Sequence, residues 1–325
     1  MLVDPLVRDA TPADAAAPRL PRGAPRRRTL LTGALVGALA LGASGVAAHP
    51  AGAAKAPKRV VALTPFTANV TARLGVRPIA VGQQADTSKL KLSSKLKGVK
   101  RLPLSHPDGP NIQQLVYTRP DLVLSSPNWR SGTPRMRQQR IRVIDSFEPV
   151  RLATVSIGMR KIGKVLGRAK QGERLARASD RAVRRARKGI AARPTVLVVL
   201  GIGRNTMAFL PNSWGGDIVS AAGGRLITSG LKPAFGSGIP GSFATISNEE
   251  IVLRKPEVII VVPHGNVKDI PRTVEYFRTQ TAWKSTPAAI NGRVHVVDPQ
   301  RLLEASDDPA KTIRWVRKDL LRNWE

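Results

Sequence analysis

Two tryptophans and two arginines stand where an α/β protein presents side chains to a ligand. Trp129 and Arg130 follow an expected strand that ends at Leu124, and Arg204 directly follows another. An arginine there can clamp a carboxylate or catecholate oxygen, and a tryptophan can cover an apolar face. The alternative for both Trp129 and Arg130 is a place on the rim. Trp214 lies in a loop that can face the same site or pack the helix that follows it.

The other candidate residues also follow expected strands. In open α/β sheets, ligands bind outside the carboxyl ends of the strands. Thr64 and Phe66 come after the first strand, and His264 comes after a buried strand late in the chain. His264 can contact a ligand or a metal, although a lone histidine in such a place is more often structural. The predicted ligand-binding residues are Thr64, Phe66, Trp129, Arg130, Arg204, Trp214 and His264.

A metal site made of protein side chains alone is not expected. The chain has no cysteine, and none of its four histidines, at positions 49, 106, 264 and 295, has a neighbour at ligand spacing. Zinc and similar ions need three or four converging ligands. Tyr117 and Tyr276 give little support for tyrosine-ligated haem. We expect no cofactor. A metal carried inside an organic chelate fits better, because the protein then needs only anion contacts and apolar surface.

Catalytic motifs are weak in this chain. Val199–Arg204 resembles the start of a dinucleotide-binding loop, but Thr206 takes the place of the third glycine. No GxSxG elbow, HExxH motif or paired-carboxylate motif occurs in the sequence. We therefore do not expect an enzyme, and an exported α/β enzyme is kept as an alternative.

The amino-terminal segment predicts export. Residues 1–28 hold six arginines, and Thr29–Ala48 runs for twenty residues without a charge. Arg27 and Arg28, directly before this run, resemble a twin-arginine signal, and Val46-Ala47-Ala48 offers a cleavage site. We expect a twin-arginine-type signal segment over residues 1–54 and a periplasmic or extracellular protein. The alternative is an uncleaved segment that tethers the protein to the membrane. The lack of cysteine excludes a lipoprotein.

The rest of the chain is strongly basic. Residues 1–54 hold six of the 53 basic residues and three of the 22 acidic ones, which leaves 47 and 19, a net charge of +28. Residues 160–188 alone hold twelve basic residues and two acidic ones. This balance favours anionic partners, so a wall- or polyanion-associated binding protein without a transport role is an alternative function. The basic residues are not interleaved with aromatics, so we expect a solvated face and no nucleic acid partner.

Continuous runs of β-branched residues alternate with helical stretches, which is typical of α/β proteins with mostly parallel sheets. Expected strands are 59–63, 77–81, 121–124 and 142–145 in a first set, and 195–200, 225–227, 258–262 and 293–297 in a second. Expected helices are 67–74, 111–118, 309–321 and a long segment over 150–190, interrupted near Gly167 and Gly172. The predicted divisions are an N-terminal lobe over 55–149, a bridging helix and following helix over 150–192, and a C-terminal lobe over 193–325.

The two strand sets contain an internal repeat. Asn111–Leu124 parallels Ser247–Ile260, because each has a capping residue, a short helix, a basic-Pro-acidic turn and a buried strand. Proline stops the helix, and the capping residue starts it. The repeat predicts two lobes of similar construction with a ligand cleft between them.

These features resemble the class III solute-binding proteins of ABC importers, the iron-siderophore and cobalamin type. The matching motifs, in the family's order, are Lys58-Arg59-Val60-Val61-Ala62-Leu63, Arg119-Pro120-Asp121-Leu122-Val123, Ser213-Trp214-Gly215-Gly216-Asp217, Lys255-Pro256-Glu257-Val258-Ile259 and Asn291-Gly292-Arg293-Val294. The resemblance implies two Rossmann-like lobes bridged by a single long α-helix, with little closure on binding. It also implies a glutamate on each lobe that pairs with permease arginines. Glu249 matches the second position, and Gln113 stands at the first.

We therefore predict an extracytoplasmic substrate-binding protein that captures a ferric siderophore or a related anionic metal chelate and delivers it to an ABC permease. We expect it to act as a monomer.

Overall fold

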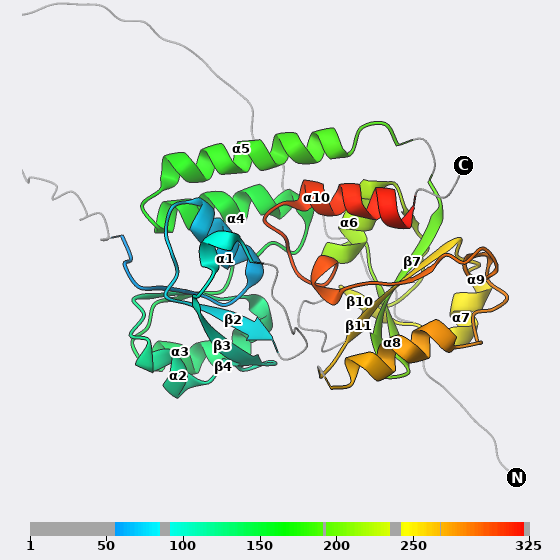
Figure 1. Ribbon diagram of the computed structural model, residues 1–325, viewed down its shortest axis with the longest axis horizontal. Helices are drawn as coiled ribbons and strands as arrows, with labels where there is room; N and C mark the ends of the chain where they lie inside the picture. Colours follow the sequence, from blue (N-terminus) through cyan, green and yellow to red (C-terminus); the bar gives the residue numbers. More distant parts are fainter. Residues whose placement is uncertain (1–55, 85–91, 191–192, 235–241, 267, 322–325) are drawn as a thin grey trace, which may run out of the picture. The chain divides into compact units, whose positions relative to one another are not determined.

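Buried strands of valine, leucine and isoleucine form two separate sheets, each accompanied by helices (Figure 1). The computed structural model describes residues 56–84, 92–190, 193–234, 242–266 and 268–321. These residues belong to one compact unit, Ala54–Glu325. The predicted signal segment, with Arg27 and Arg28, lies outside the described residues.

The first sheet has the strand order β4-β3-β2-β1-β5-β6, and its strands run parallel except for β4, which pairs antiparallel with β3. The strands are β1 (Val60–Ala62), β2 (Ala80–Gln84), β3 (Lys100–Ser105), β4 (Gly109–Pro110), β5 (Leu122–Leu124) and β6 (Val143–Ile144). Val61 of β1 pairs with Ala80 on one side and Val123 on the other. Since the chain adds β2 and β3 on one side of β1 and β5 and β6 on the other, the strand order reverses beside β1. Ligands of open α/β sheets bind at such a point.

The helices of this lobe are α1 (Pro65–Arg73), α2 (Ile112–Tyr117) and α3 (Thr133–Gln138). The predictions of helices over 67–74 and 111–118 are confirmed to within two residues. Strand β3 is not among the predicted strands. Its residues alternate between exposed and buried over most of its length, and Pro103 lies within it, so it lacks the continuous apolar run of the central strands.

The second sheet has the order β10-β8-β7-β11-β12, with β9 paired to β7. The strands are β7 (Thr195–Ile202), β8 (Asn205–Phe209), β9 (Arg225–Leu226), β10 (Phe243–Thr245), β11 (Val258–His264) and β12 (Val294–Val296). β7, β11 and β12 run parallel, whereas β7 and β8 form an antiparallel hairpin around Gly203, which has a φ of 59°. This hairpin was not predicted, because β8 is short and follows β7 directly.

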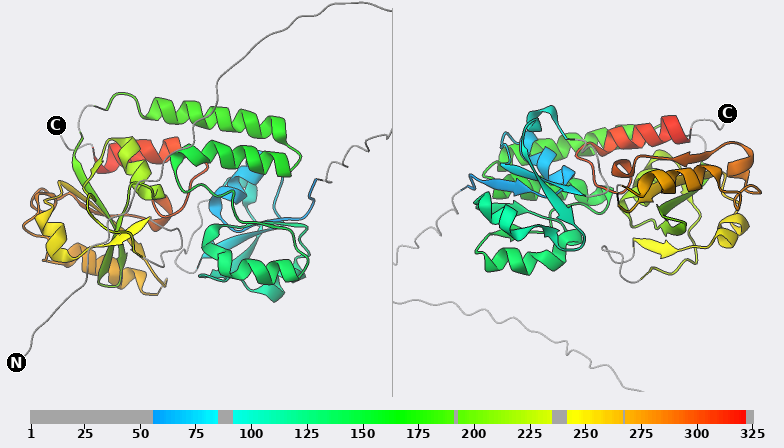
Figure 2. Two further views of the ribbon diagram at one scale, coloured as in Figure 1. Left: turned by 180° about the vertical axis from the view of Figure 1, so that it is seen from behind. Right: turned by 60° about the horizontal axis from the view of Figure 1, so that its bottom comes forward.

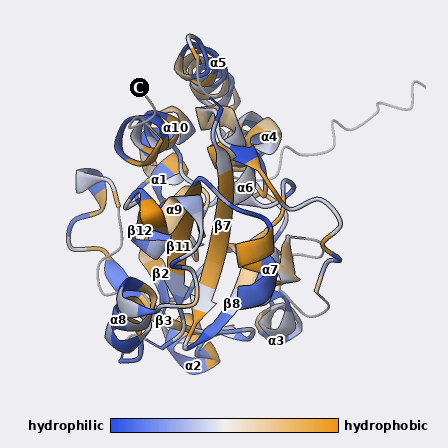
Figure 3. Ribbon diagram, turned by 90° about the vertical axis from the view of Figure 1, so that its right-hand side faces the viewer, coloured by the Kyte–Doolittle hydropathy of each residue, from blue (hydrophilic) through white to orange (hydrophobic). Residues whose placement is uncertain are grey.

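The helices of the second lobe are α6 (Trp214–Ala222), α7 (Asn248–Leu253), α8 (Ile270–Thr279), α9 (Pro287–Ile290) and α10 (Pro309–Trp315), which continues as a π-helical turn over Val316–Leu320. Hydrophobic residues follow β7 for most of its length, whereas the outer helix α8 is mainly hydrophilic (Figure 3). The predicted strands 195–200 and 258–262 are confirmed, since all their residues except Thr195 are buried.

The predicted repeat has the same backbone conformation in both copies. Asn111 caps α2 and Ser247 caps α7. The basic residue after each helix is left-handed, with φ of 47° at Arg119 and 48° at Lys255. The acidic residue then accepts hydrogen bonds from the backbone at the start of the adjacent central strand. Asp121 accepts from the amides of Lys58 and Arg59, and Glu257 accepts from the amide of Thr195 at 2.6 Å.

Two antiparallel helices, α4 (Leu152–Val165) and α5 (Ala169–Ala186), connect the lobes (Figures 1 and 2). The predicted break at Gly167 is confirmed, and its φ is 69°. Gly172 lies inside α5 instead, where it permits close packing: a Cβ on Gly163 would lie 2.8 Å from its Cα. α4 contacts α1 in the first lobe and α6 in the second. The two-lobed α/β fold is therefore confirmed. The connection consists of two helices, α4 and α5, and not of the single long helix that the resemblance implies.

Candidate ligand-binding cleft

A small cavity between the lobes lies at the strand-order reversal of the first sheet. Its first-lobe walls come from residues that follow parallel strands, and its second-lobe walls come from the start of α6 and the loop before α10. We call it the inner cavity, and its lining includes Thr64, Gln84, Ser126, Trp129, Glu148, Trp214, Leu303, Glu304 and Ala305. Its volume is about 30 Å³, which is room for one or two water-sized groups.

Thr64 follows β1 and caps α1. Its hydroxyl accepts a hydrogen bond from the amide of Thr67, and the Thr67 hydroxyl accepts one from the amide of Thr64, both at 3.2 Å. This capping box satisfies two helix-terminal donors and fixes the Thr64 side chain at the cavity wall. Phe66, in the first turn of α1, is fully buried and faces α4, where a Cβ on Gly158 would lie 3.1 Å from its ring. Thr64 thus belongs to the cavity, and Phe66 belongs to the core.

Ser126 and Trp129 follow β5. The Ser126 hydroxyl accepts from the amide of Asn128 and so begins a 3₁₀ turn over Pro127–Gly132. The turn places Trp129 inside, with only 2% of its surface exposed, and leaves Arg130 exposed. The indole Nε1 of Trp129 is buried and has no hydrogen-bond partner among the described residues. A buried N–H without a partner is uncommon, since most are paired with protein or water.

Glu148 follows β6 and lines the inner cavity. Its side chain is half-buried, and its Oε2 is buried without a hydrogen-bond partner in the described part of the chain. Burial raises the pKa of Glu148 to about 7, against the smaller lowering effect of the Ser126 and Thr64 hydroxyls. Loss of hydration disfavours the charged carboxylate, so Glu148 titrates near neutral pH.

The second lobe contributes another unpartnered indole. Ser213 caps α6 by accepting from the amide of Gly216 at 3.1 Å, which fixes Trp214 at the first position of the helix. Trp214 is 5% exposed, and its buried Nε1 has no partner within the described ranges. Trp214 therefore both packs against the core and lines the cavity, so the two interpretations of this residue from the sequence are compatible.

Hydrogen bonds join the lobes around the cavity. Gln84, at the end of β2, donates from Nε2 to Oε1 of Glu304 at 2.7 Å. On α1, Asn69 donates to a carboxylate oxygen of Asp307 at 2.9 Å, and Arg73 forms an ion pair with the other oxygen at 3.1 Å. The loop from 302 to 308 therefore fixes the second lobe against α1 and β2.

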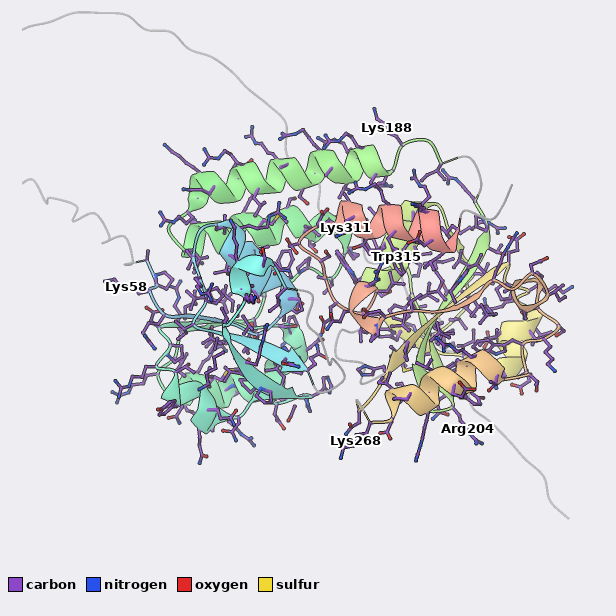
Figure 4. The ribbon with its side chains drawn as sticks, viewed as in Figure 1. Lys58, Lys188, Arg204, Lys268, Lys311 and Trp315 are labelled. Carbon is purple, nitrogen blue, oxygen red and sulfur yellow. The ribbon has the colours of Figure 1, made fainter. Side chains whose placement is uncertain are left out.

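A larger cavity lies between α1 and α10. Its volume is about 620 Å³, and its lining includes Arg73, Arg301, Asp307, Lys311 and Trp315. Figure 4 marks Lys311 and Trp315 on α10. The guanidinium of Arg301 lies 4.3 Å from the centre of the Trp315 ring. The larger cavity shares Glu304 and Ala305 with the inner cavity, so the two are neighbours along the loop before α10.

Three of the seven predicted ligand-binding residues come together in the inner cavity: Thr64, Trp129 and Trp214. The other four do not line it. Arg204 is exposed at the β7–β8 hairpin, with its guanidinium 5.8 Å from the centre of the Tyr276 ring of α8 (Figure 4). His264 is half-buried at the end of β11. Neither predicted arginine therefore stands where it could clamp a ligand in the inner cavity.

Three polar lining residues, Gln84, Glu148 and Glu304, were not predicted. Gln84 and Glu148 satisfy the strand-end rule, since they stand at or shortly after the ends of β2 and β6. Both residues would have been predicted if the expected site had extended one or two residues further past these strands. Glu304 lies in an irregular loop that only the packing of the lobes brings to the cavity, and no sequence signal marks it.

Gln113 and Glu249, the positions that the family resemblance assigns to permease docking, occupy equivalent places in the repeat. Gln113 is the second residue of α2 and Glu249 is the second residue of α7, and both are exposed. The Ser247 hydroxyl and the amide at the start of α7 lower the pKa of Glu249. Glu249 is therefore an exposed carboxylate, whereas Gln113 carries no charge.

The part of the chain that the structure describes contains no group of three or more histidine, aspartate or glutamate residues arranged to hold a metal ion. Within the same ranges, no helix combines the length and the apolar character needed to cross a membrane.

The family model for periplasmic binding proteins matches residues 60–301. No curated protein matches the chain in sequence. Among solved structures, an ABC transporter substrate-binding protein from Listeria monocytogenes EGD-e has a TM-score of 0.68 at 21% identity, covering 83% of this chain and 100% of that one. Staphylococcus aureus IsdE complexed with heme gives 0.64 at 19%, covering 81% and 98%. Staphylococcus aureus SirA complexed with staphyloferrin B gives 0.61 at 21%, covering 82% and 92%.

Because the match spans most of the chain, this protein belongs to the periplasmic binding protein family. Its structural neighbours are class III substrate-binding proteins of ABC importers, as the resemblance predicted, rather than enzymes.

Proposed function

We propose that this chain is an extracytoplasmic substrate-binding protein that captures a ferric siderophore or a related metal chelate between its lobes and delivers it to an ABC permease. The position of the inner cavity carries the proposal. It lies at the strand-order reversal, where ligands of α/β sheets bind. It is lined by Trp129 and Trp214, whose buried indole N–H groups have no hydrogen-bond partner among the described residues. Relatives with this fold are described in complexes with heme and with staphyloferrin B.

The two neighbouring cavities offer space of different sizes. Ligand sites usually measure about 300–1,000 Å³, and the larger cavity, at about 620 Å³, lies in that range. The inner cavity, at about 30 Å³, accepts a single small group. A chelate that binds at this interface therefore places its bulk outside the inner cavity, and Gln84 and Glu304 must separate if more of it is to enter.

The remaining parts of the proposal concern export and docking. Arg27 and Arg28 would direct export through the twin-arginine route, and the permease would contact the exposed starts of α2 and α7. With Gln113 in place of an acid, the first-lobe contact would lack an ion pair, so Glu249 would supply the main charged contact.

The proposal is tested by calorimetric titration of the purified protein with ferric siderophores of several chemical types, haem and cobalamin. We expect at least one of them to bind with a micromolar or lower dissociation constant. If none binds, the proposed transport function is wrong.

A second candidate function is association with an anionic wall polymer, and helix α5 supports it. Its exposed basic residues fall at helical spacing along one stripe: Lys170, Arg174, Arg177, Arg181, Arg184 and Arg185. Its two acidic residues turn towards α4 instead, where Arg160 lies 2.7 Å from Glu173 and 3.6 Å from Asp180. The stripe is about 23 Å long from Lys170 to Arg185 at 1.5 Å per residue. Helix α5 lies on the opposite side of the protein from α2 (Figures 1 and 3).

A further inference from the structure

Most cations in the basic stripe of α5 have no carboxylate partner in the described part of the chain. The members of the stripe are all exposed: Lys170, Arg174, Arg177, Arg181, Arg184 and Arg185. Arg177 alone among them forms an ion pair within the described ranges, with Glu173 at 2.7 Å. Glu173 and Asp180, the acidic residues of α5, also pair with Arg160 of α4. The stripe is therefore available to a negatively charged partner.

The stripe is narrow and straight. Its members follow one another at intervals of three or four residues, so they fall within about 100° of the helix circumference. Neighbouring charges are about 4.5–6 Å apart along the axis, over a length of about 23 Å. A linear polyanion can lie along such a line and meet one cation after another. A compact anion, such as a single chelate, reaches only part of it.

Helix α5 is fixed in place before any partner binds. Its apolar residues Leu175 and Val183 pack against the core. Arg317, which follows α10, donates from Nη2 to the carbonyl of Ala186 at 2.6 Å and from Nη1 to that of Lys188 at 2.9 Å. These bonds satisfy carbonyl groups at the C-terminal end of α5. A partner therefore meets a preformed row of charges and orders little backbone when it binds.

The stripe does not have the character of a membrane-inserting surface. None of the exposed large hydrophobic side chains in the described ranges belongs to α5. A helix that inserts into a bilayer surface needs a free apolar face, and the apolar residues of α5 are packed against the core. Helix α5 also lies on the opposite side of the protein from α2 (Figures 1 and 3), the first-lobe helix proposed to contact the permease. A docked protein would therefore turn the stripe away from the membrane.

We propose that the basic stripe of α5 binds a linear phosphodiester polymer outside the membrane, with its phosphates against successive cations, and leaves α2 and α7 free for the permease. Phosphate suits the arginines, because a guanidinium can donate two hydrogen bonds to one phosphate. This inference rests on the proposed function only for the role of α2 and α7. Transport and polymer binding then belong to two surfaces of one protein and are not alternative functions.

The first experiment measures the binding of fluorescently labelled poly(glycerol phosphate) at several salt concentrations. The natural chain is compared with an α5 variant and with a second-lobe control of equal net charge at exposed positions, Lys170→Gln/Arg174→Gln/Arg181→Gln and Lys232→Gln/Arg272→Gln/Arg278→Gln. At low salt we expect the α5 variant to bind at least about tenfold more weakly than the natural chain. Its affinity should also depend less steeply on salt, because fewer phosphate contacts release fewer counterions. The control should bind nearly as tightly as the natural chain.

The second experiment locates the polymer on the protein surface. The chain has no cysteine, so single cysteines can be introduced at Ala178, which is exposed on α5, and at Gln113 and Glu249, which are exposed on α2 and α7. Saturating poly(glycerol phosphate) should slow the alkylation of Ala178→Cys by a maleimide severalfold and leave Gln113→Cys and Glu249→Cys unchanged. Equal protection at all three positions, or none at Ala178→Cys, would overturn the inference.

Two results of the first experiment would also contradict it. Equal weakening of both triple variants would mean that net charge alone attracts the polymer. An α5 variant that keeps its affinity for the polymer but loses binding to vesicles of phosphatidylglycerol and phosphatidylcholine would identify a bilayer as the partner instead. No chelate enters either experiment, so these results leave the transport function intact, and that function fails only if the calorimetric titration finds no chelate that binds. Thermal unfolding shows that the variants are folded.

Discussion

Gln84 and Glu304 meet across the two lobes, and Nε2 of Gln84 donates to Oε1 of Glu304 at 2.7 Å. Gln84 ends a parallel strand of the first sheet, and Glu304 lies in the loop before α10. Both residues line the inner cavity. The hydrogen bond between them therefore stabilises the lobe interface and also limits ligand entry.

Gln84→Ala should therefore lower the free energy of unfolding by about 1.5–3 kcal/mol, the usual contribution of a hydrogen bond to a charged group. It should also speed ligand association, because the lobes separate more easily. Urea unfolding and stopped-flow fluorescence measure the two effects. Gln114→Ala is the control, since Gln114 is exposed on α2. Equal stability of the two variants would show that the bond contributes nothing.

The raised pKa of Glu148 predicts a pH-dependent stability. The folded state favours the protonated carboxyl up to about pH 7, whereas the ordinary pKa is 4.5. The folded protein therefore binds the extra proton between these values, and its free energy of unfolding falls as the pH rises through them, by up to about 3 kcal/mol. Glu304 is the other titratable residue among the described lining residues. Well above pH 7, protonation of Glu148 no longer contributes to the free energy of unfolding.

Glu148→Gln tests this directly, because its amide stays neutral. It should match the natural chain near pH 4.5 and exceed it by about 2–3 kcal/mol at pH 8 in urea unfolding. Glu275→Gln, which changes an exposed carboxyl on α8, should follow the natural chain at both values. A constant difference between Glu148→Gln and the natural chain across this range would mean that Glu148 ionises normally.

The repeat predicts that Asp121 and Glu257 have equal roles. Each carboxylate accepts backbone hydrogen bonds at the start of a central strand, from Lys58 and Arg59 in one lobe and from Thr195 in the other. Asp121→Ala and Glu257→Ala should each lower the free energy of unfolding by about 1–3 kcal/mol. Asp108→Ala, at an exposed position, should change it by less than about 0.5 kcal/mol. If Asp121→Ala and Glu257→Ala lower the free energy of unfolding no more than Asp108→Ala does, the two carboxylates do not stabilise the strands in this way.

Helix α5 predicts salt-sensitive binding to polyanions. Replacing Lys170, Arg174 and Arg181 with glutamine should lower the salt concentration needed to elute the protein from immobilised polyphosphate, because exposed charge interactions are screened by salt. Chelate binding should not change, since these residues lie outside the cavities. Replacing Lys232, Arg272 and Arg278 in the second lobe keeps the net charge equal and serves as the control. Equal elution of both triple variants would assign the effect to net charge alone.

The strand-end rule predicted Thr64 and Trp129 because it depends on continuous apolar runs, and these are plain in β1 and β5. Trp214 was predicted instead from the Ser213–Asp217 motif, since it follows β8, a strand that was not predicted. The rule also predicted Arg130, which is exposed and does not line the inner cavity, for a local reason. The turn over Pro127–Gly132 is kinked at Trp129, with φ of −106° and ψ of 22°, and this kinked turn buries Trp129 and leaves its neighbour exposed. A sequence does not reveal where such a turn begins.

Other parts of the fold depend on contacts that no short pattern contains. β3 gains its place by pairing with β2, although its own residues alternate between exposed and buried over most of their length. Glu304 reaches the cavity because Asp307, three residues later, is held by Asn69 and Arg73 of α1. Both depend on residues far apart in the chain.

Tryptophan fluorescence tests most directly the claim that the chelate binds at the inner cavity. The natural chain, Trp283→Phe and the double variant Trp129→Phe/Trp214→Phe are titrated with the chelate that calorimetry selects. Trp283 lies in a different core cluster and donates to Asn248. We predict saturable quenching in the natural chain and in Trp283→Phe, and its loss, with weakened binding, in the double variant. Undiminished binding and quenching in the double variant would contradict the claim.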